Sequence, residues 1–117
     1  MNLTYKGYDC EVVFGQYGNG NIGIQLVGKE NTDYEAELIS VASVNGDAQP
    51  SKGVVGIKTW SENNGILKSL IHGNVVEEGL LFSRPTGFVK IEYYSLTDES
   101  IKQINQLKEA NNEFSKR

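Results

Sequence analysis

Two segments with alternating apolar residues flank the sequence Gly18-Asn19-Gly20-Asn21 near the start of the chain. Alternate residues of the first segment form one apolar face: Tyr8, Cys10, Val12 and Phe14. The opposite face of the first segment carries Asp9 and Glu11. In the second segment, Ile22, Ile24 and Leu26 alternate with Gly23, Gln25 and Val27. A period of two is typical of half-buried strands, and Gly and Asn tolerate the positive φ of a tight turn. The pattern predicts a β-hairpin over 8–27 whose apolar face is covered by the rest of the chain.

Further strands are predicted before and after this hairpin. Residues 3–6 form a short first strand, and Lys6-Gly7 turns it into the hairpin. Residues 33–44 alternate at first and are then apolar on both sides, which indicates a strand that becomes central, with a bulge near Ile39-Ser40. A helix from Tyr34 to Ile39 is the competing interpretation, because Glu-Ala-Glu-Leu has good helix propensity. Residues 54–60 and 88–96 are predicted strands, and 83–87 a loop.

Two helices are predicted. Ser61 is a suitable N-cap for a helix that runs to Ile71 or His72 and ends at Gly73. Thr97 caps a final helix with Asp98 and Glu99 in its first turn, where the helix dipole favours anions. Its apolar stripe consists of Ile101, Ile104, Leu107 and Phe114. The expected fold is α+β: one domain over 1–117, with an antiparallel sheet and both helices packed on one face.

Composition narrows the class of protein. The chain has 117 residues and a net charge of −4, which argues against a general nucleic-acid binder. The start of the chain does not resemble a secretory signal, and no apolar run is long enough to span a membrane. The single cysteine, Cys10, fits a small buried side chain in a reducing compartment. We therefore expect a cytoplasmic protein, monomeric or homodimeric, that uses no cofactor.

The densest charge cluster is acidic and contains Glu30, Asp33, Glu35 and Glu37. It is either a solvated strand face or a surface that docks on a basic partner, where complementary charge speeds encounter and fixes orientation. Tyr93 and Tyr94 are adjacent on a predicted strand, so one should be buried and one exposed. We take Tyr94 as the candidate contact residue, because an exposed tyrosine is a common anchor at interfaces.

Catalytic and metal sites are not predicted. One histidine and one cysteine do not supply a recognisable ligand set, and Cys10 has no predicted neighbouring base. The alternative site is a small-ligand site for a nucleotide signal in the segment Ser83 to Gly87. There, the Arg84 guanidinium would grip an anion, with help from the Thr86 hydroxyl and the Gly87 amide.

Four features together resemble a family of small uncharacterised proteins from phages and conjugative elements. They are YGNGNIGIQLV, the Ser43-Val44-Asn45 strand end, a short helix with Leu-Ile, and TGFVKIEYYSL, and the likeness covers roughly Tyr17 to Leu96. The long polar C-terminal helix departs from the family pattern. The resemblance implies a non-enzymatic accessory protein of a mobile element. Its implied partner is a bacterial defence protein, such as a CRISPR–Cas effector, which it would inhibit as anti-CRISPR proteins do.

Overall fold

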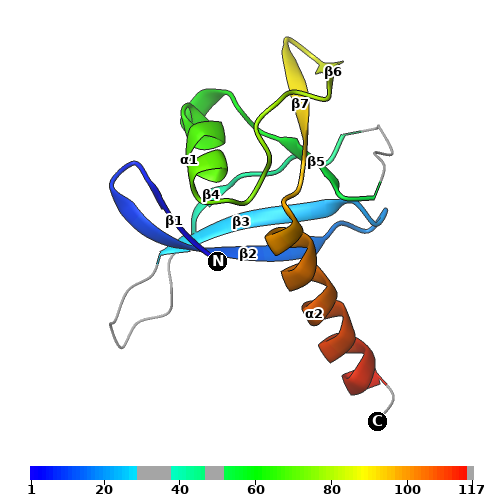
Figure 1. The fold of residues 1–117 in the computed structure, drawn as a ribbon. Helices are drawn as coiled ribbons and strands as arrows, with labels where there is room; N and C mark the ends of the chain where they lie inside the picture. Colours follow the sequence, from blue (N-terminus) through cyan, green and yellow to red (C-terminus); the bar gives the residue numbers. More distant parts are fainter. Residues whose placement is uncertain (29–37, 47–51, 116–117) are drawn as a thin grey trace.

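A four-stranded antiparallel sheet forms the first layer of the molecule (Figure 1). The computed structural model describes residues 1–28, 38–46 and 52–115. The strands are β1 (Asn2–Tyr5), β2 (Tyr8–Gln16), β3 (Ile22–Gly28) and β4 (Leu38–Val41), and they are adjacent in the sheet in chain order. Asp33 to Glu37 of the predicted 33–44 strand lie outside the described residues.

The predicted hairpin is confirmed. β2 pairs with β3 from Gln16↔Ile22 at the turn to Cys10↔Gly28 at the far end. Within the turn, the left-handed residue is Gly20, with φ of 89°. The first strand is also confirmed, because Lys6 and Gly7 both adopt positive φ and return β1 to β2. The β2–β3 turn therefore has glycine at its left-handed position, whereas the β1–β2 turn combines Gly7 with a non-glycine residue, Lys6, at φ of 50°.

The predicted bulge is present in β4. Val27 pairs with Leu38, but the preceding residue, Leu26, pairs with Ser40, so Ile39 is the extra residue. After β4 the chain continues between two strands. The Ala42 amide donates to the Ile24 carbonyl of β3, and the Ala42 carbonyl accepts from the backbone amide of Lys58, directly after the second sheet's first strand. This run joins the four-stranded sheet to a second sheet.

The second sheet contains β5 (Val54–Ile57), β7 (Val89–Ser95) and β6 (Phe82–Thr86) in the spatial order β5-β7-β6. The predicted 54–60 strand ends at Ile57, and the predicted loop over 83–87 is wrong, since Ser83 to Thr86 belong to β6. Thr86 pairs with Val89, so the turn contains only Gly87 and Phe88. Gly87 has φ of 61°, and glycine at the first turn position is a recognised tight-hairpin signal. Pro85 is tolerated because β6 is an edge strand.

The internal helix α1 (Ile66–His72) begins later than predicted. Ser61 has φ of 60° and starts a single 3₁₀ turn, Ser61–Asn63, rather than capping the α-helix. The cap is Gly65, with φ of 87°, which explains a glycine inside the predicted helix. The end at Gly73 is confirmed, and Ile66 and Leu70 face the core.

The C-terminal helix α2 (Asp98–Ser115) is capped as predicted, because Thr97 Oγ1 accepts from the Ser100 amide at 3.1 Å. Ile104 is buried and Ile101 packs against the core. Leu107, however, is exposed, and the C-terminal half of the helix extends away from the two sheets (Figure 1). The Phe114 side chain lies outside the described set.

The main core lies between the inner face of the four-stranded sheet, α1, and one face of β5 and β7. Its largest fully buried members are Ile24, Leu26, Ile57, Ile66 and Leu70. Cys10 is fully buried there, and burial raises the pKa of its thiol, as expected for a small apolar side chain. The predicted α+β class is confirmed, with two antiparallel sheets in place of the one expected.

Candidate functional site

The acidic cluster predicted from the sequence is not described by the structure. Glu30, Asp33, Glu35 and Glu37 all fall within 29–37, which lies outside the described residues. In sequence, that segment connects β3 to β4. The cluster therefore stays a prediction.

The exposure expected of Tyr94 is wrong. Tyr94 is only 4% exposed and its hydroxyl donates to Glu92 Oε1 at 2.5 Å. Burial, together with this hydrogen bond and the Glu92 charge, raises the pKa of Tyr94 to about 12. Tyr93 points to the opposite side of β7 and is also buried, because its ring stacks on Phe82 with centroids 4.5 Å apart. Both faces of the strand are covered, so neither tyrosine is an exposed anchor.

The three residues of the alternative anion site lie at the end of the β6–β7 hairpin. Arg84, Thr86 and Gly87 are all exposed. The guanidinium carbon of Arg84 lies 5.7 Å from the centre of the Phe82 ring, a cation–π distance. Lys90 pairs with Pro85, so it projects from the opposite face of the hairpin to Arg84. The two cations of this hairpin thus do not converge on one anion.

The structure brings together a different surface, on the side of the four-stranded sheet that faces away from the core. We call it the outer face. Its residues follow from the strand register, which pairs Glu11 with Val27, Val13 with Gln25, and Gly15 with Gly23. β4 adds Leu38 opposite Val27 and Val41 opposite Gln25. The outer face thus has three cross-strand rows of residues, and the Gly15–Gly23 row carries no side chains.

The bulge at Ile39 creates the apolar part of this surface. Leu38 and Val41 are three residues apart, so in a regular strand they would point to opposite faces. The extra residue between Leu38 and Ser40 places Leu38 and Val41 on the same face. Val13, Leu38 and Val41 are 42%, 52% and 39% exposed, and Ser40 between them is buried. Three large apolar side chains are therefore presented to solvent on the outer face: Leu38 and Val41 on β4, and Val13 on β2, with Gln25 of β3 between Val13 and Val41. We call these three side chains the apolar row.

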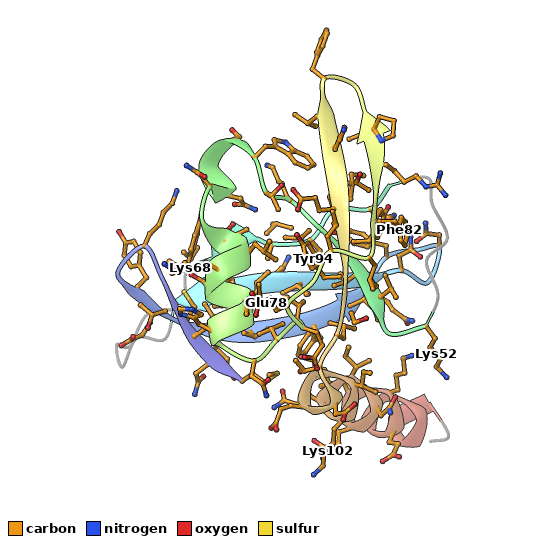
Figure 2. The ribbon with its side chains drawn as sticks, turned by 45° about the horizontal axis from the view of Figure 1, so that its top comes forward. Lys52, Lys68, Glu78, Phe82, Tyr94 and Lys102 are labelled. Carbon is orange, nitrogen blue, oxygen red and sulfur yellow. The ribbon has the colours of Figure 1, made fainter. Side chains whose placement is uncertain are left out.

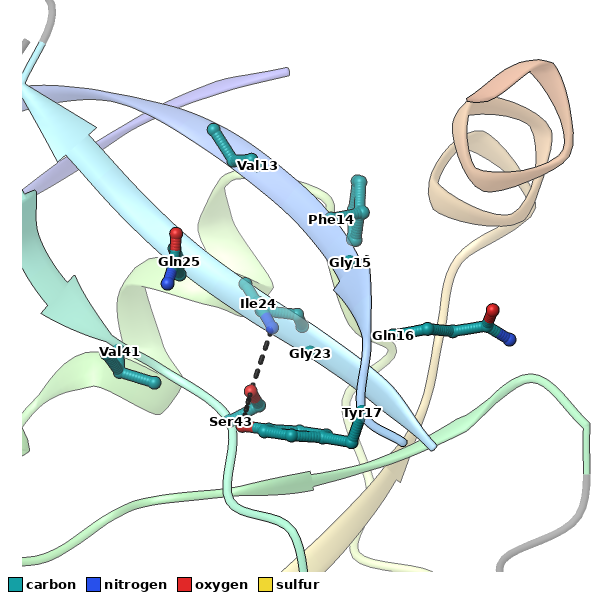
Figure 3. A pocket seen from close by; sticks show the side chains of 10 residues that line it. All are labelled: Val13, Phe14, Gly15, Gln16, Tyr17, Gly23, Ile24, Gln25, Val41 and Ser43. Atoms are coloured by element: carbon teal, nitrogen blue, oxygen red, sulfur yellow. Dashed lines mark hydrogen bonds between the residues drawn. The ribbon is translucent and has the colours of Figure 1, made fainter. Parts of the chain in front are cut away.

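Beside this apolar row lies a hollow of about 410 Å³, which we call the glycine socket (Figure 3). Its floor is the Gly15–Gly23 pair, and its walls include Val13, Val41 and Tyr17. A Cβ added to Gly15 would meet no atom within 4 Å, so the space above this residue is open. Glycine in a strand often marks a place where another group approaches the backbone closely.

One wall of the socket is held in place by hydrogen bonds. Tyr17 Oη and Ser43 Oγ are 3.0 Å apart, and Ser43 Oγ also accepts from the Ile24 amide at 2.8 Å (Figure 3). The Tyr17 ring lies against Gly23, 3.5 Å from where a Cβ would stand. Because Ser43 is buried and both of its contacts are made, the tyrosine ring is a fixed wall.

Carboxylates border the apolar row on β2. Glu11 lies on the outer face two residues from Val13, and Asp9 follows on the same face. Both are exposed, and Asp9 accepts a hydrogen bond from Thr4 Oγ1 at 3.3 Å. The outer face therefore combines apolar side chains, an open socket and negative charge.

The remaining chemistry-bearing residues are dispersed. His72 is exposed in the last turn of α1, and Phe88 is fully exposed at the tip of the β6–β7 hairpin. Within 1–28, 38–46 and 52–115, no three His, Cys, Asp or Glu side chains gather in a way that could hold a metal ion. In the same ranges, no helix combines the length and apolarity needed to cross a membrane.

The glycine socket does not follow from the sequence pattern, although its two glycines are visible there. Each strand of the predicted hairpin contains a glycine, Gly15 or Gly23, but their pairing depends on Tyr17 belonging to the turn, because a turn limited to the Gly-Asn tetrad would pair Gly15 with Ile24. Val41 and Leu38 could not be assigned to one face without the exact position of the bulge. Comparison with protein-family models, with curated proteins and with solved structures found no match to this chain.

Proposed function

We propose that this protein acts by binding another protein, without catalysing a reaction, and that the outer face is its contact surface. The observation that supports this proposal is the exposure of three apolar side chains on the same face of the sheet, Leu38 and Val41 on β4 and Val13 on β2. Single exposed apolar residues are ordinary on protein surfaces, whereas adjacent ones rimmed by polar groups are typical of interaction sites. The glycine socket beside the row offers space for one apolar or aromatic side chain of the partner.

The charge of the surface favours a basic partner. Glu11 and Asp9 adjoin the apolar row, and the whole chain carries a net charge of −4. Complementary charge around an apolar contact accelerates association and selects against acidic proteins. The cluster of Glu30, Asp33, Glu35 and Glu37 belongs to the connection between β3 and β4, and we propose that it adds to this negative charge.

The resemblance to proteins of phages and conjugative elements supplies the class of partner. On that basis we propose a bacterial defence protein, such as a CRISPR–Cas effector, that is inhibited in the cytoplasm of the host. The outer face supports binding to a basic protein, and the nature of that protein rests on the resemblance alone.

The test is capture of a partner from a bacterial host lysate, with and without nuclease, followed by affinity measurements with purified proteins. Val13→Asp together with Val41→Asp should lower the affinity by about 100-fold, as loss of a buried interface anchor does. The control is Phe88→Ser, which removes a fully exposed apolar side chain at the tip of the β6–β7 hairpin and should leave the affinity unchanged. A folded double variant that binds as tightly as the wild type would overturn the proposal.

A further inference from the structure

A second hollow, separate from the outer face, lies where α2 meets the rest of the molecule. Its volume is about 350 Å³. Its floor is apolar, with Leu96 and Ile104 buried and Ile22 and Ile101 half-buried. The rim is polar and exposed, and it consists of Lys52, Asn105 and Lys108. Small-molecule sites commonly have this form, an apolar interior with a few polar groups that fix orientation.

The sequence of α2 builds one side of this hollow. Ile101, Ile104 and Lys108 follow the spacing i, i+3, i+7, which places them on one helix face. That face is apolar near the core and ends in an ammonium group. Lys102 belongs to another face of the same helix, and Figure 2 shows it pointing away from the sheets.

The second ammonium group comes from the segment before β5. Gly53 has φ of 85°, and a Cβ there would lie 3.5 Å from Ile101 Cδ1. The chain therefore passes directly against α2 at Gly53, and this contact places Lys52 at the rim of the hollow. Two lysines from distant parts of the sequence thus border one apolar cavity.

We propose that this hollow binds an amphipathic monoanion, a carboxylate attached to a short hydrocarbon chain. The hydrocarbon occupies the floor formed by Ile22, Leu96 and Ile104, where burial of apolar surface supplies the driving force. The carboxylate lies between Lys52 and Lys108, and the Asn105 amide offers a hydrogen-bond donor beside them. The rest of the chain is acidic, so these lysines are a local source of attraction for an anion.

Octanoate is the probe for this site, measured by calorimetry and by the rise in melting temperature of the full chain. Three comparison compounds separate the two parts of the proposal: octanol lacks the charge, octylammonium reverses it, and acetate lacks the hydrocarbon. Octanoate should bind at least about tenfold more tightly than any of them, since one ion pair in a partly apolar site is worth at least that ratio. Equal binding of octanoate, octanol and octylammonium would overturn the proposal, as would no binding of octanoate to the folded protein.

Charge reversal on α2 provides a matched pair of variants. Lys108→Glu should abolish detectable octanoate binding, whereas Lys102→Glu changes the net charge equally and should leave binding unchanged. Both positions are exposed, so both variants should fold. In methyl NMR spectra, octanoate should shift the signals of Ile22, Leu96 and Ile104. Shifts at Val13 and Val41 instead, or the same loss of binding in both lysine variants, would contradict the assignment.

Discussion

Gly15 and Gly23 face each other across β2 and β3, on the exposed side of the four-stranded sheet. A pair of glycines in the middle of a hairpin weakens both strands, because glycine loses more conformational entropy on folding than other residues. The pair leaves backbone uncovered beside Val13 and Val41, and this is what forms the glycine socket. We interpret the weakened strand pair as the structural cost of an open contact surface.

Replacement of Gly15 separates stability from binding. Gly15→Val should raise the free energy of unfolding by about 0.5–1 kcal/mol, because the position is open, does not require positive φ and lies in a strand. The same side chain would fill the socket, so affinity for the protein partner should fall. Urea denaturation and a binding titration measure the two effects. Gly18→Ala, in the hairpin turn and outside the socket, is the control and should leave the affinity unchanged. A Gly15→Val protein that is stabilised and binds the partner normally would show that the socket is unused.

Gly56 in β5 should respond in the opposite way. A Cβ there would lie 2.9 Å from Ile91 Cγ2, 3.0 Å from the Tyr93 ring and 3.1 Å from the Val44 carbonyl oxygen. Gly56→Ala should therefore lower the free energy of unfolding by about 1–3 kcal/mol through overpacking. Gly15→Ala is the matched control, since it is the same substitution in a strand with no atom within 4 Å. Equal stabilities of the two variants in urea would show that the packing around Tyr93 is looser than described.

The N-terminal anchor of α2 depends on one hydroxyl group. Thr97 Oγ1 accepts from the Ser100 amide at 3.1 Å and donates to the Asn74 carbonyl oxygen at 2.7 Å. Thr97→Val keeps the shape of the side chain and removes both bonds, so it should cost about 1–2 kcal/mol of stability. Thr86→Val on the exposed edge strand β6 should change stability by less than about 0.5 kcal/mol. A Thr97→Val protein as stable as wild type in urea would contradict this role of the hydroxyl.

Local chemistry in the sequence was sufficient to predict much of the fold. The Gly-Asn turn, the Lys6-Gly7 turn, the bulge at Ile39 and the Thr97 cap each depend on neighbouring residues only, and each is present. The sequence does not predict β6, because Ser83, Pro85 and Gly87 are residue types typical of loops. Gly87 followed by an alternating segment is also a two-residue hairpin signal, and an edge strand accepts proline.

Features that depend on distant parts of the chain could not be predicted in this way. The burial of Tyr93 requires Phe82 and Gly56, which come from two other strands, so alternation along β7 gave no indication that both tyrosines are covered. The outer face likewise depends on residues that come from different strands. Its apolar row combines residues of β2 and β4, and its membership changes with a one-residue shift in the bulge.

The hydrogen bond between Tyr94 and Glu92 leads to a prediction for alkaline pH. The pKa of Tyr94 is raised from 10.0 to about 12, first by burial and then by its bond to Glu92 and the charge of that carboxylate. A group that binds its proton more tightly in the folded state gives its full stabilisation below the unfolded pKa. That stabilisation is lost as pH rises towards the folded pKa. For Tyr94 the loss should begin near pH 10 and amount to about 2–3 kcal/mol by pH 12.

Tyr94→Phe isolates this contribution from the other groups that titrate in the same range. At pH 7 the variant should be about 1–2 kcal/mol less stable than wild type, because Glu92 Oε1 loses its donor. Between pH 10 and pH 12 the difference should shrink and then reverse, since only the wild type then has to place a second negative charge beside Glu92. Urea unfolding at pH 7, 9, 10, 11 and 12 measures the difference, and Tyr8→Phe serves as the control because Tyr8 is exposed. A difference that stays constant across this range would mean that Tyr94 titrates as an ordinary tyrosine, and the close pairing with Glu92 would then be wrong.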